Sequence, residues 1–406
     1  MAMDVSSLFQ EKSRSEVAVS ATYASITAYI AADQLFSSFL PSTLIRVFEL
    51  LCLVAIFWFV LQVFLCRENA RYRGWPLLLI ALLALSCLSI IARGEYEGGI
   101  KNMILNKFSY MQIPAYILPF AILVLPNRKY LTAILNVFFF SMLAVIPIWL
   151  MQSVNLIQQQ EGFPSEYIGV YLPFFGTVLI LFRRHLSTRR RRVVYAIYFA
   201  YFMLMILNAR RNMIVSLSLW FGIAYLMGNA TKLKTNMRAR LLLLFGVVAV
   251  AVFVAISWDW LSQTVFQFIL DRGMEDTRSG VEALFLADMA SSPVSDWVFG
   301  RGIDGTYIQM TEDAQTLEVS FDRHLIETGY LYAILKGGLF HLLLYLLFLF
   351  TAFIRGISVK KHLLQGLALF LTVYLLEMYM TNWVFFFSVK AVVFWFAVSV
   401  CLQYKK

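Results

Sequence analysis

The sequence predicts an all-α polytopic membrane protein with about twelve transmembrane helices and one large external loop between helices 9 and 10. Three observations support this prediction: the composition, the recurrence of long apolar runs, and the distribution of basic residues between them. The chain of 406 residues is 60% hydrophobic and 16% aromatic, and only 14% of its residues are charged. A water-soluble core cannot hide that much apolar surface, so the composition excludes an ordinary soluble globular protein.

Apolar runs of about 17 to 25 residues, each long enough to cross ~30 Å of hydrocarbon, recur along the chain. The first run is the least apolar, because it contains Asp33 and many small polar residues. The expected spans are Ala21–Leu40, Ser42–Cys66, Gly74–Ala92, Met111–Pro126, Tyr130–Met151, Tyr167–Phe182, Val193–Asn208, Met213–Gly228, Leu241–Trp258, Gly329–Ile354, His362–Met380 and Trp383–Leu402.

The basic residues test this topology, because Lys and Arg are retained on the cytoplasmic side of short loops. With the amino terminus inside, the inside segments hold 22 of the 34 basic residues and the outside segments hold 9. The inside segments lie around residues 12–14, 67–73, 128–129, 183–192, 232–240, 355–361 and 405–406. Both termini are therefore expected in the cytoplasm. The net charge of +10 is then a topology signal with a contribution from anionic lipid headgroups, and no nucleic-acid partner is expected.

The domain organisation that follows is one membrane domain over residues 1–406, with an external insertion at 259–327. Four cysteines occur without C-x-x-C spacing, so neither a disulfide framework nor a cysteine metal site is expected. Glu95 and Glu97 place two carboxylates in an outside loop. A divalent cation usually needs more oxygen ligands than two, so no metal and no cofactor are expected.

Several ionisable residues fall inside the expected spans, where each is costly unless it is paired or faces a polar cavity. Arg46 and Glu49 are one helical turn apart and are expected to pair, and Glu377 is expected to pair with Lys390 on a neighbouring helix. Lys336 follows the long external loop by one to two turns. It is expected to line a cavity that opens outward.

Arg210 and Arg211 lie in a short outside turn between two apolar runs, against the positive-inside bias. Arginines next to a helix amino terminus form a natural anion site, because guanidinium and free backbone N–H groups both favour phosphate oxygens. The alternative is that both side chains extend to lipid headgroups.

Within the external insertion, Trp260–Leu270 is expected to form an interfacial helix. Asp276 and Thr277 are expected to cap a helix that begins at Arg278 and ends near Ala290. The glycine-rich turn from Gly300 to Gly305, which contains Arg301, is similar to a phosphate loop but lacks its complete pattern and a preceding strand.

The insertion ends with Asp322, Arg323, His324 and Glu327, directly before an apolar helix. Three potential proton acceptors and an arginine are thus expected at the outer mouth of a transmembrane helix, where one of them could act as a general base. The alternative is that these residues are solvated at the start of the helix and take no part in chemistry.

Four elements occur in a fixed order: an arginine pair at Leu207–Val215, an arginine-led helix at Asp276–Gly280, a glycine turn at Val298–Tyr307, and a helix entry at Glu327–Leu339. With the predicted spans, they resemble the superfamily of O-antigen ligases and Wzy-type polysaccharide polymerases. The matches cover about Asn208–Gly228 and Asp276–Ile354, and the helix entry is closer to polymerases. His324 is followed by Leu325, whereas ligases of this family carry a His-Asn or similar pair before the helix.

The resemblance implies a GT-C-like protein of the bacterial inner membrane with a periplasmic loop. It implies metal-independent transfer of a glycan from an undecaprenyl-diphosphate carrier to another carrier-linked repeat unit, with chain-length regulator and flippase proteins as partners. A ligase, and a lipid-linked oligosaccharide flippase or other transporter, are the alternatives. The implied diphosphate-binding residues are Arg211, Arg210, Arg278, Arg301 and Arg323, of which Arg211 fits better than Arg210. The implied proton acceptor is Glu327, His324 or Asp322, with Glu327 preferred.

Overall fold

The computed structural model describes residues 13–36, 41–94, 106–109, 111–158, 172–207, 211–235, 277–312 and 318–404. Helices dominate these residues, and eleven of the twelve expected spans overlap a helix, although α8 and α18 are shorter than the spans expected there. The remaining one, Leu241–Trp258, lies outside the described residues, as does the expected interfacial helix Trp260–Leu270. The eleven helices are α1 (Arg14–Phe36), α2 (Ser42–Leu65), α3 (Trp75–Ala92), α5 (Ile113–Leu123), α6 (Leu131–Gln158), α8 (Leu172–Leu181), α9 (Thr188–Leu207), α10 (Arg211–Thr235), α16 (Gly329–Ser358), α17 (His362–Met380) and α18 (Val389–Gln403).

Helices α2, α3, α16 and α17 are long and apolar enough to cross a membrane. Several other apolar helices, such as α5 and α18, are shorter. Helix α2 turns large apolar side chains outward, and Leu51, Val54 and Phe57 are 62%, 65% and 72% exposed. An apolar face of this kind is unfavourable in water and matches the hydrocarbon of a bilayer. These are the features of a membrane protein.

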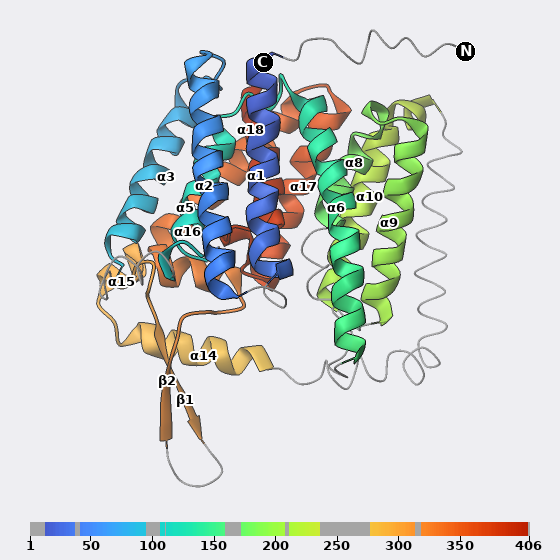
Figure 1. Cartoon of the computed structure of the whole chain (residues 1–406). Coiled ribbons are helices and arrows are strands. Elements are labelled where there is room, and N and C mark those ends of the chain that lie inside the picture. Colours follow the sequence, from blue (N-terminus) through green and yellow to red (C-terminus); the bar gives the residue numbers. More distant parts are fainter. Residues whose placement is uncertain are drawn as a thin grey trace, which may run out of the picture.

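The helices stand side by side (Figure 1). The connections between α2 and α3, α5 and α6, α8 and α9, and α16 and α17, here called the basic loops, lie at one end of the bundle. Lys129, between α5 and α6, pairs with Glu68, after α2, at 2.8 Å. Hydrogen bonds from Lys129 and Tyr130 hold the pKa of the Glu68 carboxyl below its ordinary value. Arg128 lies over the ring of Tyr404, which follows α18. Segments that were expected to share one side of the membrane are therefore neighbours in space.

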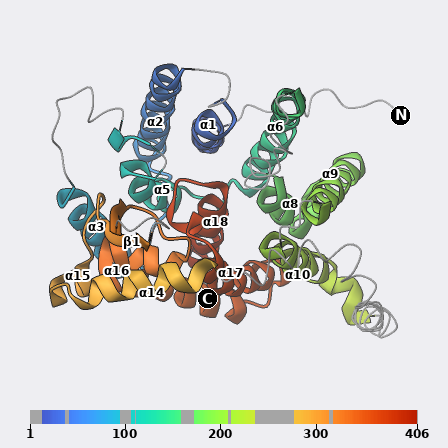
Figure 2. The ribbon, with the colours of Figure 1, turned by 90° about the horizontal axis from the view of Figure 1, so that it is seen from below.

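Helix α18 is the centre of the bundle and is buried over nearly its whole length. It contacts α5, α8, α16 and α17. Its Trp395 packs edge-on against Tyr345 of α16, with ring centroids 5.2 Å apart. Figure 2 shows α18 enclosed by these helices, with α17 between α16 and α10. The core thus holds the carboxyl-terminal helices together.

Both expected ion pairs within the apolar helices are confirmed. Arg46 Nη1 lies 2.5 Å from Glu49 Oε2 within α2. Lys390 Nζ at the start of α18 lies 2.6 Å from Glu377 Oε2 near the end of α17, and both side chains are almost fully buried. Lys390 also lies over the ring of Phe174 in α8, 5.0 Å from its centroid. The pair therefore joins three helices.

Candidate functional site

The described part of the insertion, residues 277–312 and 318–327, contains α14 (Thr277–Ala290), α15 (Val294–Phe299) and a hairpin of two antiparallel strands, β1 (Tyr307–Glu312) and β2 (Glu318–Arg323). Helix α14 confirms the expected helix from Arg278 to Ala290 and lies across the end of the bundle opposite the basic loops (Figure 1). The hairpin was not predicted. Asp322 and Arg323 consequently end a strand instead of leading directly into a helix.

A small hydrophobic cluster fixes this insertion on the first turns of α16. Phe285 and Met289 of α14 and Tyr307 of β1 are fully buried against Ile334 and Leu335 of α16. The rings of Phe285 and Tyr307 meet edge-on, with centroids 5.7 Å apart. The spacing of Phe285 and Met289, four residues apart, puts both on one face of α14. The insertion is therefore a packed part of the protein.

A break in α16 receives the glycine-rich turn. Gly338 interrupts the helix with φ +72°, and a Cβ there would lie 2.2 Å from the carbonyl oxygen of Val298 in α15. The backbone N–H groups of Arg301 and Gly302 donate to the carbonyls of Leu335 and Lys336, at 2.7 Å and 3.0 Å. A Cβ added at Gly300, which has φ +73°, would lie 2.5 Å from the carbonyl oxygen of Lys336. The turn therefore replaces helical hydrogen bonds that α16 loses at its break.

The turn does not act as a phosphate loop in this structure, because several of its backbone N–H groups donate hydrogen bonds to protein carbonyls. Besides Arg301 and Gly302, Ile303 donates its N–H to the carbonyl of Ile90 in α3, at 3.0 Å. Arg93, just after α3, donates to the carbonyls of Phe299 and Gly300, each at 2.6 Å. The turn is thus a docking element between α3 and α16.

Lys336 takes part in this docking and does not line an open cavity as was expected. Its side chain is buried, and Nζ donates to the carbonyls of Ile303 and Gly305 at 3.0 Å and 2.8 Å. Asp304, in the same turn, pairs with Lys107. A buried ammonium group that satisfies backbone carbonyls explains a lysine in this helix without reference to substrate.

Arg301, an expected diphosphate ligand, is held by carboxylates of its own segment. Its guanidinium lies 2.6 Å from Asp288 of α14 and 3.4 Å from Asp296 of α15, and it also donates to Ser292. These contacts neutralise the charge and tie α14 to α15. We therefore assign Arg301 to the support of the insertion.

Arg323 and Glu327 both act electrostatically on the phenol of Tyr307. Tyr307 and Arg323 are directly opposite each other in the hairpin, so their side chains share one face. Burial raises the pKa of the Tyr307 phenol above its ordinary value, Arg323 opposes this rise, and Glu327 adds to it. Glu327 and His324 are exposed to solvent at the mouth of α16. A carboxylate, a guanidinium and a phenol thus share one small region.

A second carboxylate, that of Glu282, lies at the start of α16 and was not predicted. Thr328 donates its hydroxyl hydrogen bond to Glu282 of α14, and Asn382 Nδ2 donates to the carbonyl of Ile326 at 2.5 Å. These contacts fix the backbone on both sides of Glu327. Glu282 follows Arg278 by four residues in α14. This spacing was visible in the sequence, but nothing in the sequence indicated that Glu282 contacts Thr328.

For three other expected site residues, Arg211, Arg278 and Asp322, the structure describes the position of the backbone. Arg211 is the first residue of α10. Arg278 lies in the first turn of α14, and Asp322 is paired in register with Ile308. Arg210, like Glu95 and Glu97, lies outside the described residues. Helix α17 contacts both α10 and α16, so Arg211 and Glu327 belong to segments on different sides of α17.

Within the ranges that the structure describes, no group of three or more His, Cys, Asp or Glu side chains is placed to hold a metal ion. Comparison with known proteins identified no relative: no family model, no curated protein and no solved structure matches the chain. The function must therefore be argued from the site.

Proposed function

We propose that this protein is an envelope polysaccharide polymerase, a glycosyltransferase that joins oligosaccharide repeat units linked to undecaprenyl diphosphate. The observation that carries the proposal is the fixed docking of the insertion on α16, which sets Arg323 opposite Tyr307 in the hairpin and Glu327 just before α16 at the end of an apolar helical bundle. A membrane-anchored donor and acceptor would meet the protein at that end. The resemblance of the four sequence motifs supports the same reaction.

In the proposed reaction, a hydroxyl oxygen of the acceptor sugar attacks the anomeric carbon of the donor glycan. The new glycosidic bond forms as the bond between that carbon and the diphosphate oxygen breaks, and undecaprenyl diphosphate leaves with the electron pair. Glu327 accepts the hydroxyl proton. Arg211, Arg278 and Arg323 stabilise the charge that develops on the diphosphate, with no metal required. Preorganised positive charge in such a site lowers the barrier because it needs no rearrangement during the reaction.

The proposal includes a topology of about twelve spans in a GT-C-like arrangement. It places the protein in the bacterial inner membrane, with both termini in the cytoplasm and the insertion in the periplasm. Membrane lipids surround the apolar helices, and chain-length regulator and flippase proteins are the proposed partners. Support comes from the segregation of the basic loops to the end opposite the insertion.

A ligase, which moves a finished glycan to a different acceptor, would use the same chemistry and differs in its product. A lipid-linked oligosaccharide flippase or other transporter is the alternative from another class. A transporter needs a continuous path for its substrate and has no need of a packed one-sided insertion. The buried core between α14, β1 and α16 therefore favours an enzyme.

We expect Glu327→Gln to lower the turnover of a purified lipid-linked repeat unit by about 10²–10⁴-fold, because a general base contributes that much to proton transfer. The variant keeps the size of the side chain, and Glu327 is exposed, so folding should not change. The matched control is Glu16→Gln, which removes a carboxylate at the opposite end of the bundle and should leave turnover unchanged. Unchanged turnover in Glu327→Gln would remove Glu327 as the base.

A further inference from the structure

A basic cavity of about 370 Å³ lies at the end of the bundle opposite the insertion. Four cationic residues and two histidines are among its twelve lining residues, and none of the twelve is acidic. Like charges that converge without a carboxylate repel one another, and binding an anion would relieve that repulsion. The cationic residues and histidines are Arg128, Arg184, Lys360, Lys361, His185 and His362.

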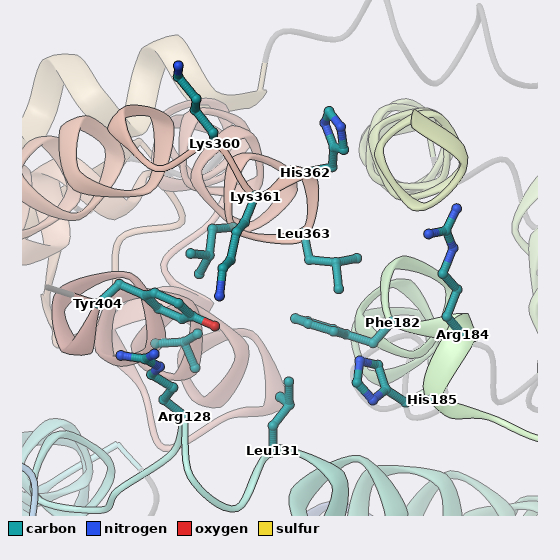
Figure 3. A pocket seen from close by; sticks show the side chains of 12 residues that line it. Arg128, Leu131, Phe182, Arg184, His185, Lys360, Lys361, His362, Leu363 and Tyr404 are labelled. Carbon is teal, nitrogen blue, oxygen red and sulfur yellow. The ribbon is translucent and has the colours of Figure 1, made fainter. Parts of the chain in front are cut away.

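The ring of Tyr404 positions two of these cations. Arg128 Cζ lies 3.9 Å from the ring centroid and Lys361 Nζ lies 5.1 Å from it. The two cations come from segments 233 residues apart in number, the loop before α6 and the residue before α17. Figure 3 shows Lys361 pointing toward Tyr404 into the space beside Phe182, whereas Lys360 and His362 extend away from its centre. Arg128 and Lys361 are therefore the central pair.

The wall that carries Tyr404 is held in place by hydrogen bonds. Gln403 accepts from the backbone N–H of Arg128 at 3.1 Å and donates to the carbonyl of Leu125 at 2.7 Å. Arg355 donates to the carbonyl of Leu402 at 3.1 Å. The cations thus approach a ring whose backbone is anchored to the loop between α5 and α6 and to α16. Such preorganisation lowers the entropy lost when a ligand binds.

The amino terminus of α17 forms part of the same wall. Lys361 is the N-cap residue, no side chain caps the helix, and the first helical residues His362, Leu363 and Leu364 line the cavity. The positive end of a 19-residue helix therefore adds to the charge of the side chains. Apolar residues complete the lining, among them Leu131, Phe182 and Val400. A cationic rim above apolar side chains is suited to a charged group attached to hydrocarbon.

We propose that this cavity binds a phosphate group, carried either by an anionic membrane lipid or by free phosphate. Arg128 and Lys361 bind the phosphate oxygens, the first turn of α17 adds its positive end, and the apolar lining accepts the first part of a lipid chain. The site is separate from the proposed catalytic end and does not depend on the proposed reaction.

The test uses the full-length protein in a non-ionic detergent and follows its thermal unfolding. Three additions are compared at matched ionic strength: short-chain phosphatidylglycerol, short-chain phosphatidylcholine and inorganic phosphate. The pocket variant is Arg128→Gln with Lys361→Gln, each also measured alone. The control is Arg189→Gln with Arg192→Gln, which removes two exposed charges from α9 at the same end but outside the cavity.

We expect phosphatidylglycerol to raise the unfolding temperature more than phosphatidylcholine does. The pocket variant should bind it at least about 10-fold more weakly, because two charge-assisted contacts are lost, and the control should bind as the wild type does. If inorganic phosphate alone reproduces the shift and its dependence on the pocket, the site binds free phosphate. If neither addition depends on Arg128 and Lys361, with each single variant folded and behaving as the control, the proposal is overturned.

Discussion

Replacing Gly338 with alanine is expected to release the insertion from the membrane helices and to lower the free energy of unfolding by about 2–4 kcal/mol. Two independent effects combine. A side chain disfavours the φ of +72° that Gly338 adopts, and its Cβ would lie 2.2 Å from the carbonyl oxygen of Val298. Backbone on both sides of the contact leaves little room for relaxation.

The same substitution tests whether docking matters for the proposed chemistry. If α15 and the glycine-rich turn withdraw from α16, Arg301 and Gly302 lose their hydrogen bonds to the carbonyls of Leu335 and Lys336. The backbone that leads to Glu327 would then lose its fixed position. We expect lower thermal stability in detergent, faster proteolysis within residues 277–328, and reduced glycosyl transfer.

A matched control is available in α14. A Cβ at Gly280 would meet no atom within 4 Å, and alanine is favoured over glycine in a helix by about 0.5–1 kcal/mol. Gly280→Ala should therefore leave stability unchanged or raise it slightly. Wild-type stability and proteolysis in Gly338→Ala would contradict the break in α16.

Removing the ammonium group of Lys390 is expected to lower the free energy of unfolding by about 3–5 kcal/mol, because Glu377 would be left as an uncompensated buried charge. Lys390 Nζ contacts Glu377 Oε2 at 2.6 Å, and Glu377 Oε1 has no hydrogen-bond partner in the described part of the chain. Among the described residues, Lys390 is the cation within ion-pair distance of Glu377. Lys390→Met should therefore lower the unfolding temperature strongly.

The double variant Glu377→Leu with Lys390→Met separates a structural pair from a functional one. A buried pair replaced by apolar residues of similar volume is often neutral in stability, so the double variant should recover to within about 1 kcal/mol of the wild type. Recovery of both stability and glycosyl transfer would show a structural role. Arg189→Met, at an exposed position in α9 outside the basic cavity, is the control and should change stability by less than about 0.5 kcal/mol. Equal stability of Lys390→Met and the wild type would contradict a buried pair.

The sequence predicted the helices well because each apolar run specifies its element locally. The ion pairs Arg46–Glu49 and Glu377–Lys390 were also predictable, since a charge in an apolar helix requires a partner. The helix from Arg278 to Ala290 was predicted from Asp276 and Thr277 before it and Pro293 after it; α14 begins at Thr277, and Asp276 lies outside the described residues. These features depend on neighbours along the chain or on the cost of burying charge.

The break in α16 and the hairpin could not be predicted in the same way. Gly337 and Gly338 lie in an apolar run that is typical of an ordinary transmembrane helix, and only the backbone of α15 shows why one of them is required. Tyr307 and Arg323 are opposite each other only after the strands pair. The basic cavity joins loops and the end of α18 across the whole chain. Contacts between distant segments decide all three.

The most direct test of the proposed function is incubation of the purified full-length protein with an undecaprenyl-diphosphate-linked repeat unit, with products separated by size. We expect a ladder of products that persists in the presence of a chelator. Arg211→Ala should reduce the ladder by about 10²-fold or more, because the diphosphate would lose a fixed positive charge. Arg192→Ala, at an exposed position in α9, is the control and should leave the ladder intact. No product, or a single transfer that requires a foreign acceptor, would contradict a polymerase.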